Sequence, residues 1–199
     1  MDNAEVPMWV SAPDSPALQG DEQFTEGDAT VLDFWRFAMS DLRVNNVRGY
    51  LAEFLVARAL GVAAKRVEWD DYDVLWNDVK IEVKSSAYLQ VWPQRAPSQI
   101  RFAGLRGRTW GDITQGMSVE KIYKADIYVL ASLTTRDHRD YDPLDVGAWE
   151  FFVVPRSVLA ELKADSIGRA TAARLAAPVG YDQLAAAIVA AANPSVERG

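Results

Sequence analysis

The 199-residue sequence has no cysteine and a single histidine, His138. Without cysteine the chain forms no disulfide bond and offers no thiolate for zinc binding or nucleophilic catalysis, which is consistent with a reducing compartment. One histidine, set in the polar run 134–140, leaves too little material for a Ser-His-Asp triad or a multi-histidine zinc site. We therefore interpret His138 as an ordinary loop residue.

Long hydrophobic runs are also missing. No stretch of about 20 apolar residues is present, so we expect no membrane-spanning helix. Residues 1–7 lack the basic and apolar regions of a signal peptide, and we expect a cytoplasmic protein. The net charge of −7 disfavours a polyanionic partner, and any nucleic-acid function must be reconciled with it.

The composition that remains is that of an ordinary globular protein, with 49% hydrophobic and 25% charged residues. A chain of this length predicts one domain and can bury a core without covalent staples. We expect an irregular arm over residues 1–27, a single α/β domain over residues 28–193 and a frayed tail over residues 194–199.

The apolar pattern predicts helices and strands in mixed order. A Pro-, Gly- and Arg-rich loop is expected over 92–117. The expected helices cover about 29–42 (N-capped by Asp28), 46–60 (ending at Gly61), 119–124, 157–163 and 181–192. The expected strands cover 66–69, 72–76, 79–85 or as far as 91, 127–133 and 149–154. Helices outside a mixed sheet give an α/β fold class.

The segment 70–85, DDYDVLWNDVKIEVKS, predicts a β-hairpin around the two-residue turn Asn77-Asp78. That turn fixes which residues face each other across the hairpin. One face is then apolar, with the pairs Trp76/Val79, Val74/Ile81 and Tyr72/Val83. The other face carries the pairs Leu75/Lys80, Asp73/Glu82 and Asp71/Lys84.

Asp73 and Glu82 would thus place two carboxylates about 4.5–5.5 Å apart at their Cβ atoms, an unfavourable arrangement unless a cation or a shared proton lies between them. Hard divalent cations such as Mg²⁺ prefer such oxygen ligands. Lys84 lies on the same face, where its ammonium group could reach a phosphate or an attacking water. The acid-x-Lys triplet also occurs at 78–80 and 161–163, so a solvated strand face of alternating charge is the alternative.

Glu53 lies within the largely apolar helical stretch 49–60. A glutamate in such a stretch is seldom fully buried unless it is paired. It is either bridged to Arg58 or Arg48 at the edge of the helix or directed at the metal site.

A helix with an inward glutamate, followed by an aspartate and then by Glu82-Val83-Lys84 on a strand, resembles the PD-(D/E)XK nuclease superfamily. The resemblance spans about 49–91 and continues loosely through 127–133 and 149–154. It implies a restriction-endonuclease-like core, in which a helix, three antiparallel strands, a helix and a further strand build a mixed central sheet flanked by helices.

The resemblance also implies roles for individual residues. Asp73 and Glu82 would be metal-binding carboxylates, the backbone carbonyl of Val83 a further ligand, and Lys84 the catalytic lysine. Glu53 would be the helix glutamate, binding metal directly or through water, and Gln90 would match a glutamine of some members. Tyr72 stands where the family pattern has proline, and the cluster Asp70, Asp71, Asp73 leaves Asp71 as an alternative ligand.

The distribution of charge bears on a DNA substrate. Residues 80–124 hold eight Lys or Arg and three acidic residues, a net +5, which leaves −12 for the rest of the chain. This basic excess is interleaved with Trp92, Phe102 and Trp110, a combination suited to phosphate contact and base stacking, although it also fits a merely solvated basic loop. The candidate DNA-binding residues are Gln90, Arg95, Arg101, Arg106 and Arg108.

These features together predict a Mg²⁺-dependent nuclease, with Mn²⁺ as a substitute ion, acting on DNA in preference to RNA. A homodimer is compatible with that expectation, because superfamily members that cut both strands often act as dimers. One alternative is a non-catalytic nuclease-like module that binds DNA or a protein partner. The other is an unrelated domain whose charged hairpin is only solvated.

Overall fold

The computed structural model describes residues 16–63, 65–66, 68, 70–110 and 117–193. By its internal contacts the chain divides into two compact units, Met1–Ser40 and Asp41–Gly199.

The first unit contains helix α1 (Val31–Met39), which begins after a capping box at Thr30. The Thr30 hydroxyl accepts a hydrogen bond from the Asp33 amide, and the Asp33 carboxylate accepts one from the Thr30 amide at 2.9 Å. Each residue thereby satisfies a backbone donor at the start of the helix. The expected cap at Asp28 is therefore wrong, and the helix is shorter than the predicted 29–42.

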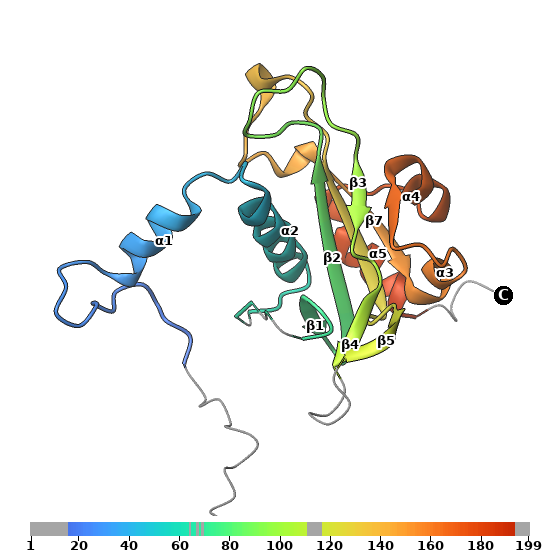
Figure 1. Cartoon of the computed structure of the whole chain (residues 1–199), viewed down its shortest axis with the longest axis horizontal. Helices are drawn as coiled ribbons and strands as arrows, with labels where there is room; N and C mark the ends of the chain where they lie inside the picture. The colour runs from blue at the N-terminus through green and yellow to red at the C-terminus, as the bar shows by residue number, and fades with distance from the viewer. Residues whose placement is uncertain (1–15, 64, 67, 69, 111–116, 194–199) are drawn as a thin grey trace, which may run out of the picture. The chain divides into compact units, whose positions relative to one another are not determined.

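The second unit is built on a four-stranded mixed sheet, which agrees with the predicted α/β class (Figure 1). The strand order is β1 (Val74–Trp76), β2 (Val79–Ala87), β6 (Ile127–Leu133) and β7 (Trp149–Pro155). Strands β2 and β6 run parallel, whereas the other two neighbouring pairs are antiparallel.

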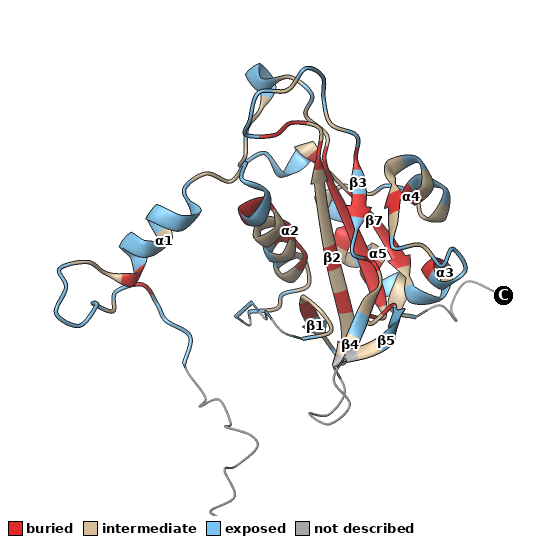
Figure 2. Cartoon of the chain, in the orientation of Figure 1, coloured by how far each residue is buried: buried red, intermediate tan, exposed pale blue. Residues whose placement is uncertain are grey.

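Both faces of this sheet are covered, which explains why β6 is buried at every position (Figures 1 and 2). Ile127 and Val129 pack toward α2 (Asn45–Ala59) and α5 (Tyr181–Ala192). The alternate residues Tyr128 and Leu130 belong to a second core cluster on the opposite face. That face is covered by β3 (Arg101–Ala103), β8 (Ser166–Gly168), α3 (Arg156–Ala160) and α4 (Arg169–Leu175).

Several expected elements match the structure closely. Asn77 and Asp78 form the predicted hairpin turn, and their φ angles of 47° and 64° are the left-handed values that a two-residue turn of this kind requires. Gly61, with φ of 68°, follows the end of α2 as a C-terminal glycine. The helix over 181–192 and the strand over 127–133 are confirmed, and the strand at 149 extends one residue further, to Pro155.

Other expectations are wrong. The segment expected to be a helix over 119–124 lies largely in strand β5 (Met117–Ile122), which pairs with β4 (Gly107–Trp110) inside the expected loop. A short segment of this kind takes its conformation from its pairing partner more than from its own propensity. Of the strand expected over 66–69, residues 66 and 68 lie outside any strand, and residues 67 and 69 lie outside the described residues. Helix α3 ends at Ala160, earlier than predicted.

The element order implied by the resemblance is therefore not reproduced. Among the described residues, the chain between β2 and β6 contains β3, β4 and β5 and no helix. His138 opens the short 3-10 helix η1 (His138–Asp140), which lies with a second one, η2 (Val146–Ala148), in the connection from β6 to β7. Within the described part of the chain, no helix combines the length and the apolar character needed to cross a membrane.

Candidate functional site

Asp73 is the residue just before β1. Because β1 begins only at Val74, its pairing with β2 does not continue past Ile81. The paired residues are Trp76–Val79, Leu75–Lys80 and Val74–Ile81, as predicted, and the pairing stops there. The Asp73 amide donates to the Ile81 carbonyl at 2.9 Å, and its carboxylate accepts from the Val83 amide at 2.7 Å. The predicted facing pairs Asp73–Glu82 and Tyr72–Val83 are therefore wrong in register, because the Asp73 side chain takes the backbone donor that a longer β1 would have used.

Glu82 and Lys84 follow on β2 and lie on one face of the strand, as the hairpin pattern predicted. On β6 their lateral neighbours are Tyr128 and Leu130. The Lys84 ammonium group forms an ion pair with the Glu82 carboxylate. The side chains of Glu82 and Lys84 are 20% and 27% exposed, so this pair is partly withdrawn from water.

Gly104 forms a backbone turn beside the Lys84 side chain. Its φ is 71°, a conformation that L-residues rarely adopt. A Cβ atom at this position would lie 3.9 Å from Lys84 Cε, so the space itself would tolerate a small side chain. The glycine is therefore required by the backbone turn more than by the contact with Lys84.

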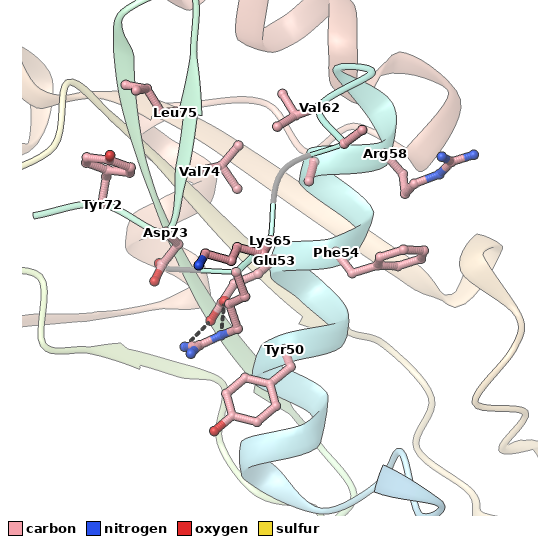
Figure 3. Close-up of a pocket in the computed structure, with 13 residues that line it drawn as sticks. Tyr50, Glu53, Phe54, Arg58, Val62, Lys65, Tyr72, Asp73, Val74 and Leu75 are labelled. Carbon is pink, nitrogen blue, oxygen red and sulfur yellow. Dashed lines mark hydrogen bonds and ion pairs between the residues drawn. The ribbon is translucent and has the colours of Figure 1, made fainter. Parts of the chain in front are cut away.

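Glu53 approaches the same edge of the sheet from α2 (Figure 3). Its side chain is 12% exposed and forms an ion pair with Arg66, with distances of 2.5 Å to Arg66 Nε and 3.2 Å to Arg66 Nη2. The proposed bridges to Arg48 or Arg58 are wrong. Arg48 instead donates to the Arg43 carbonyl and the Asn45 side chain at the start of α2.

Electrostatics connect these groups. Burial raises the pKa of Glu53, and the negative charge of Asp73 raises it further, while Arg66 and Lys84 oppose the shift. Burial likewise raises the pKa of Glu82, where Lys84 opposes the shift and Asp73 adds to it. The charge of Asp73 therefore acts on two carboxyl groups that come from different elements. Asp73 therefore lies between Glu53, with which it lines one cavity, and the strand that carries Glu82 and Lys84, whose intervening residue Val83 donates to it.

The pairing of β1 with β2 ends before it reaches Asp71, so the predicted facing of Asp71 and Lys84 is not part of the hairpin. Asp71 forms an ion pair with Lys124 at 2.9 Å. With Glu82 it lines a small cavity of about 170 Å³, whose wall includes the buried Tyr128. Burial raises the pKa of Tyr128 to about 12, so its hydroxyl group stays protonated at neutral pH. Asp71 thus remains an alternative partner for Glu82.

A larger cavity of about 620 Å³ lies between α2 and β1 and includes Glu53 and Asp73 in its wall (Figure 3). The other lining residues are Tyr50, Phe54, Ala57, Arg58, Val62, Ala63, Lys65, Arg66, Tyr72, Val74 and Leu75.

The candidate DNA-binding residues are dispersed. Gln90 is buried, and its amide donates to the Ala87 carbonyl at 3.1 Å. Arg101 donates to the Ser166 hydroxyl, and Arg106 to the Lys121 carbonyl at 2.6 Å. The remaining candidates, Arg95 and Arg108, are exposed.

The cations opposite the acidic residues were missed by the sequence analysis. A nearly buried glutamate indicates that a cation lies nearby, but the pattern did not identify Arg66, which lies thirteen residues further along the chain. No local signal connects Asp71 with Lys124 either, because they are 53 residues apart.

Within the described residues, no three acidic or histidine side chains converge closely enough to hold a metal ion. No family model, curated protein or solved structure matches this chain.

Proposed function

We propose that this protein is a Mg²⁺-dependent phosphodiesterase that hydrolyses DNA. The observation that carries the proposal is the position of Asp73, whose carboxylate accepts from the amide of Val83, between Glu82 and Lys84, and which lines one cavity with Glu53. The negative charge of Asp73 also raises the pKa of both glutamates. These groups come from α2, from the residue before β1 and from β2. Partly buried carboxylates of like charge raise each other's pKa, and a bound divalent cation would offset that repulsion by drawing their oxygens into one ligand set.

The donor set has the chemistry that a hard divalent cation prefers. Asp73 and Glu82 offer carboxylate oxygens, and the carbonyl of Val83 projects to the same open edge as its amide, which already contacts Asp73. The Glu82–Lys84 ion pair must open for Glu82 to act as a ligand. A bound Mg²⁺ would polarise the scissile phosphate and acidify a coordinated water.

Lys84 and Glu53 would then have different roles in the hydrolysis. Once separated from Glu82, the Lys84 ammonium group can orient the attacking water and stabilise the charge that develops on the phosphate oxygens. Glu53 would complete the ligand set directly or through water. The ion pair with Arg66 opposes the rise in the pKa of Glu53 that burial causes.

A non-catalytic module that binds DNA or a protein partner is the second candidate. The observation that favours it is that Glu82 and Glu53 each have a cationic partner within the chain, Lys84 and Arg66. These ion pairs balance the acidic charges without any metal.

Incubation of the protein with supercoiled and linear DNA, in Mg²⁺, Mn²⁺ or EDTA, tests the proposal. We expect cleavage in either metal and none in EDTA. Lys84→Ala should reduce cleavage by about 100-fold or more, the scale of losing one preorganised charge-stabilising group. Lys80→Ala is the matched control, because Lys80 lies on the same strand and the same face.

Each outcome separates the candidates. Cleavage that persists in EDTA, or at full rate in Lys84→Ala, contradicts the proposed site. DNA binding without cleavage under any of these conditions supports the non-catalytic module.

A further inference from the structure

We propose that the 620 Å³ cavity between α2 and β1 takes one unpaired nucleobase, so that the substrate is single-stranded or locally unpaired nucleic acid. This inference rests on the proposed function for the identity of the ligand as nucleic acid. It goes beyond that function by naming a binding site and a class of substrate.

The cavity has the size and the walls that a base requires. Ligand pockets of roughly 300–1,000 Å³ accommodate small organic molecules and are mostly apolar with a few placed polar groups. This cavity falls within that range, and its lining is predominantly apolar, with Ala57, Val62, Val74 and Leu75 among its walls.

The cavity wall has a charged part and a largely apolar part, with Arg58 beside Val62 in the latter. Figure 3 shows Glu53, Asp73 and Lys65 gathered at one end and Val62, Val74 and Leu75 at the other. The charged end is the proposed catalytic edge. A nucleotide has the same division, with a flat apolar base on one side and a charged phosphate on the other. A base in the apolar end would place its phosphate beside Glu53 and Asp73.

Cationic and aromatic side chains at the cavity suit the backbone of a single strand. Arg58, Lys65 and Arg66 all line it, and the Arg66 guanidinium lies 4.3 Å from the centroid of the Tyr50 ring. Basic grooves with aromatic and arginine planes are typical of sites that bind unpaired strands. An apolar protein segment would also fill the cavity, but the charged residues in its wall favour a ligand that carries a phosphate as well as an apolar ring. Because Arg66 already pairs with Glu53 and Glu68, a phosphate would share that cation with them.

A paired duplex does not satisfy this arrangement. The bases of a duplex are stacked inside the helix, and only their edges reach a protein. A base enters a cavity of this kind only when it is unpaired or rotated out of the stack. The cavity therefore selects for single strands, ends or distorted positions.

The test measures binding separately from cleavage. Fluorescence anisotropy in EDTA would follow the full chain with a fluorescein-labelled oligothymidylate of about a dozen nucleotides, a length within the range of known single-strand sites. A duplex of equal length would serve as the second probe. We expect the single strand to bind more tightly than the duplex.

Two variants locate the binding site. Val62→Phe fills the apolar end and should weaken single-strand binding by about 10-fold or more, the scale of losing one stacked base, while duplex binding stays unchanged. Val62 follows the end of α2, and the larger ring extends into empty space. Leu75→Ala removes an exposed wall residue and should act in the same direction without threatening the fold. Val189→Phe, at an exposed position of α5 outside the cavity, is the control.

The outcomes distinguish this inference from the proposed function. Equal single-strand binding by parent, Val62→Phe and Leu75→Ala overturns the cavity assignment, and metal-dependent cleavage by the same proteins would leave the nuclease proposal intact. Single-strand binding that is lost in both variants supports the cavity even if no cleavage occurs. A change of oligomeric state in Val62→Phe with unchanged oligonucleotide binding would assign the cavity to a protein segment and overturn the inference.

Discussion

Two glutamate–arginine ion pairs in this protein look alike and differ in their electrostatics. Glu53 on α2 pairs with Arg66, and Glu150 on β7 pairs with Arg169 through both of its carboxylate oxygens, one at 2.6 Å. Their glutamate side chains are 12% and 13% exposed. Burial raises the pKa of Glu53 on balance, whereas hydrogen bonds from Arg169 and Ser132 outweigh burial and lower the pKa of Glu150.

The neighbours of the two pairs explain the difference. Glu150 receives a third hydrogen bond, from the Ser132 hydroxyl at 2.5 Å, so its charged form is well solvated by the protein. Glu53 has the like charge of Asp73 nearby, which disfavours its charged form. A carboxylate that the fold satisfies contributes to stability, and one that the fold leaves under repulsion is a candidate for function.

The largest expected difference between the two ion pairs is in the rate of DNA cleavage. Glu53→Gln keeps the shape of the side chain but removes its charge, and we expect it to reduce cleavage at low Mg²⁺ by about 10- to 100-fold, the scale of losing a group that supports a metal site. Glu150→Gln should cleave like the parent. Initial rates across a Mg²⁺ titration measure both, and equal rates for parent and Glu53→Gln at every concentration would assign Glu53 to a structural role.

Stabilisation by metal is the next effect in size. A ligand that binds only the folded protein stabilises it by about 2.7 kcal/mol at a hundred times its Kd. We expect Mg²⁺ or Mn²⁺ to raise the Tm of the parent and of Lys84→Ala but not of Asp73→Asn, because Asp73 is the proposed ligand and Lys84 acts on water and phosphate. An equal shift in the parent and in Asp73→Asn would exclude Asp73 and make Asp71 the candidate.

Without metal, Glu150→Gln should lower the free energy of unfolding more than Glu53→Gln does, which is the reverse of the order expected for cleavage. At pH 7, Glu150→Gln should lose about 1 kcal/mol, because hydrogen bonds to a charged group weaken and the exposed Arg169 limits their worth. Glu53→Gln should lose little or gain, since the fold already disfavours the charge of Glu53.

The contributions of Glu150 and Glu53 to the free energy of unfolding depend on pH with opposite signs. The contribution of Glu150, whose pKa is lowered, is present above the ordinary glutamate value of 4.5 and is lost as the pH falls through its folded pKa. The contribution of Glu53, whose pKa is raised, is present below 4.5 and is lost as the pH rises through its folded pKa. Urea unfolding of both variants and the parent, at neutral pH and near pH 4, measures the two effects; a common direction would show that the pairs are equivalent.

The smallest expected effect comes from removing the charge of Asp73, which contributes to the pKa difference between Glu53 and Glu150. Asp73→Asn keeps an oxygen that can accept from the Val83 amide but relieves the repulsion on Glu53 and Glu82. Metal-free stability should stay unchanged or rise by up to about 1 kcal/mol. The pKa of Glu53 should fall and so come closer to that of Glu150. Carboxyl carbon NMR during a pH titration would measure the change. An unmoved pKa would mean that burial alone sets the value.

Much of the framework could be predicted from local sequence. The turn at Asn77-Asp78 and the facing pairs next to it follow from period-two alternation, and the end of α2 at Gly61 follows from a glycine after a helical pattern. The largely apolar run 127–133 predicted a strand, and the structure confirms it as β6. These features depend on neighbours within a few residues, and the sequence therefore contains them directly.

The site was predicted less completely than the strands that hold it. Glu53, Asp73, Glu82 and Lys84 were predicted as one group; in the structure Asp73 lines a cavity with Glu53 and accepts from the amide between Glu82 and Lys84. The contact of Asp73 with the Val83 amide and the ion pairs of Glu53 and Glu82 were not predicted. They depend on where β1 stops and on which cations reach the edge, and neither is encoded in a periodic pattern.

The sequence by itself determined the alternation of the hairpin, the helices with the glycine that follows the end of α2, and the acidic and basic residues available for chemistry. Only the tertiary structure decided that β5 is a strand, that Lys124 meets Asp71, and that Arg66 meets Glu53. The reason is physical: hydrogen-bond periodicity acts over a few residues, whereas ion pairs and strand partners are chosen by proximity in space, after burial has fixed the positions of distant segments.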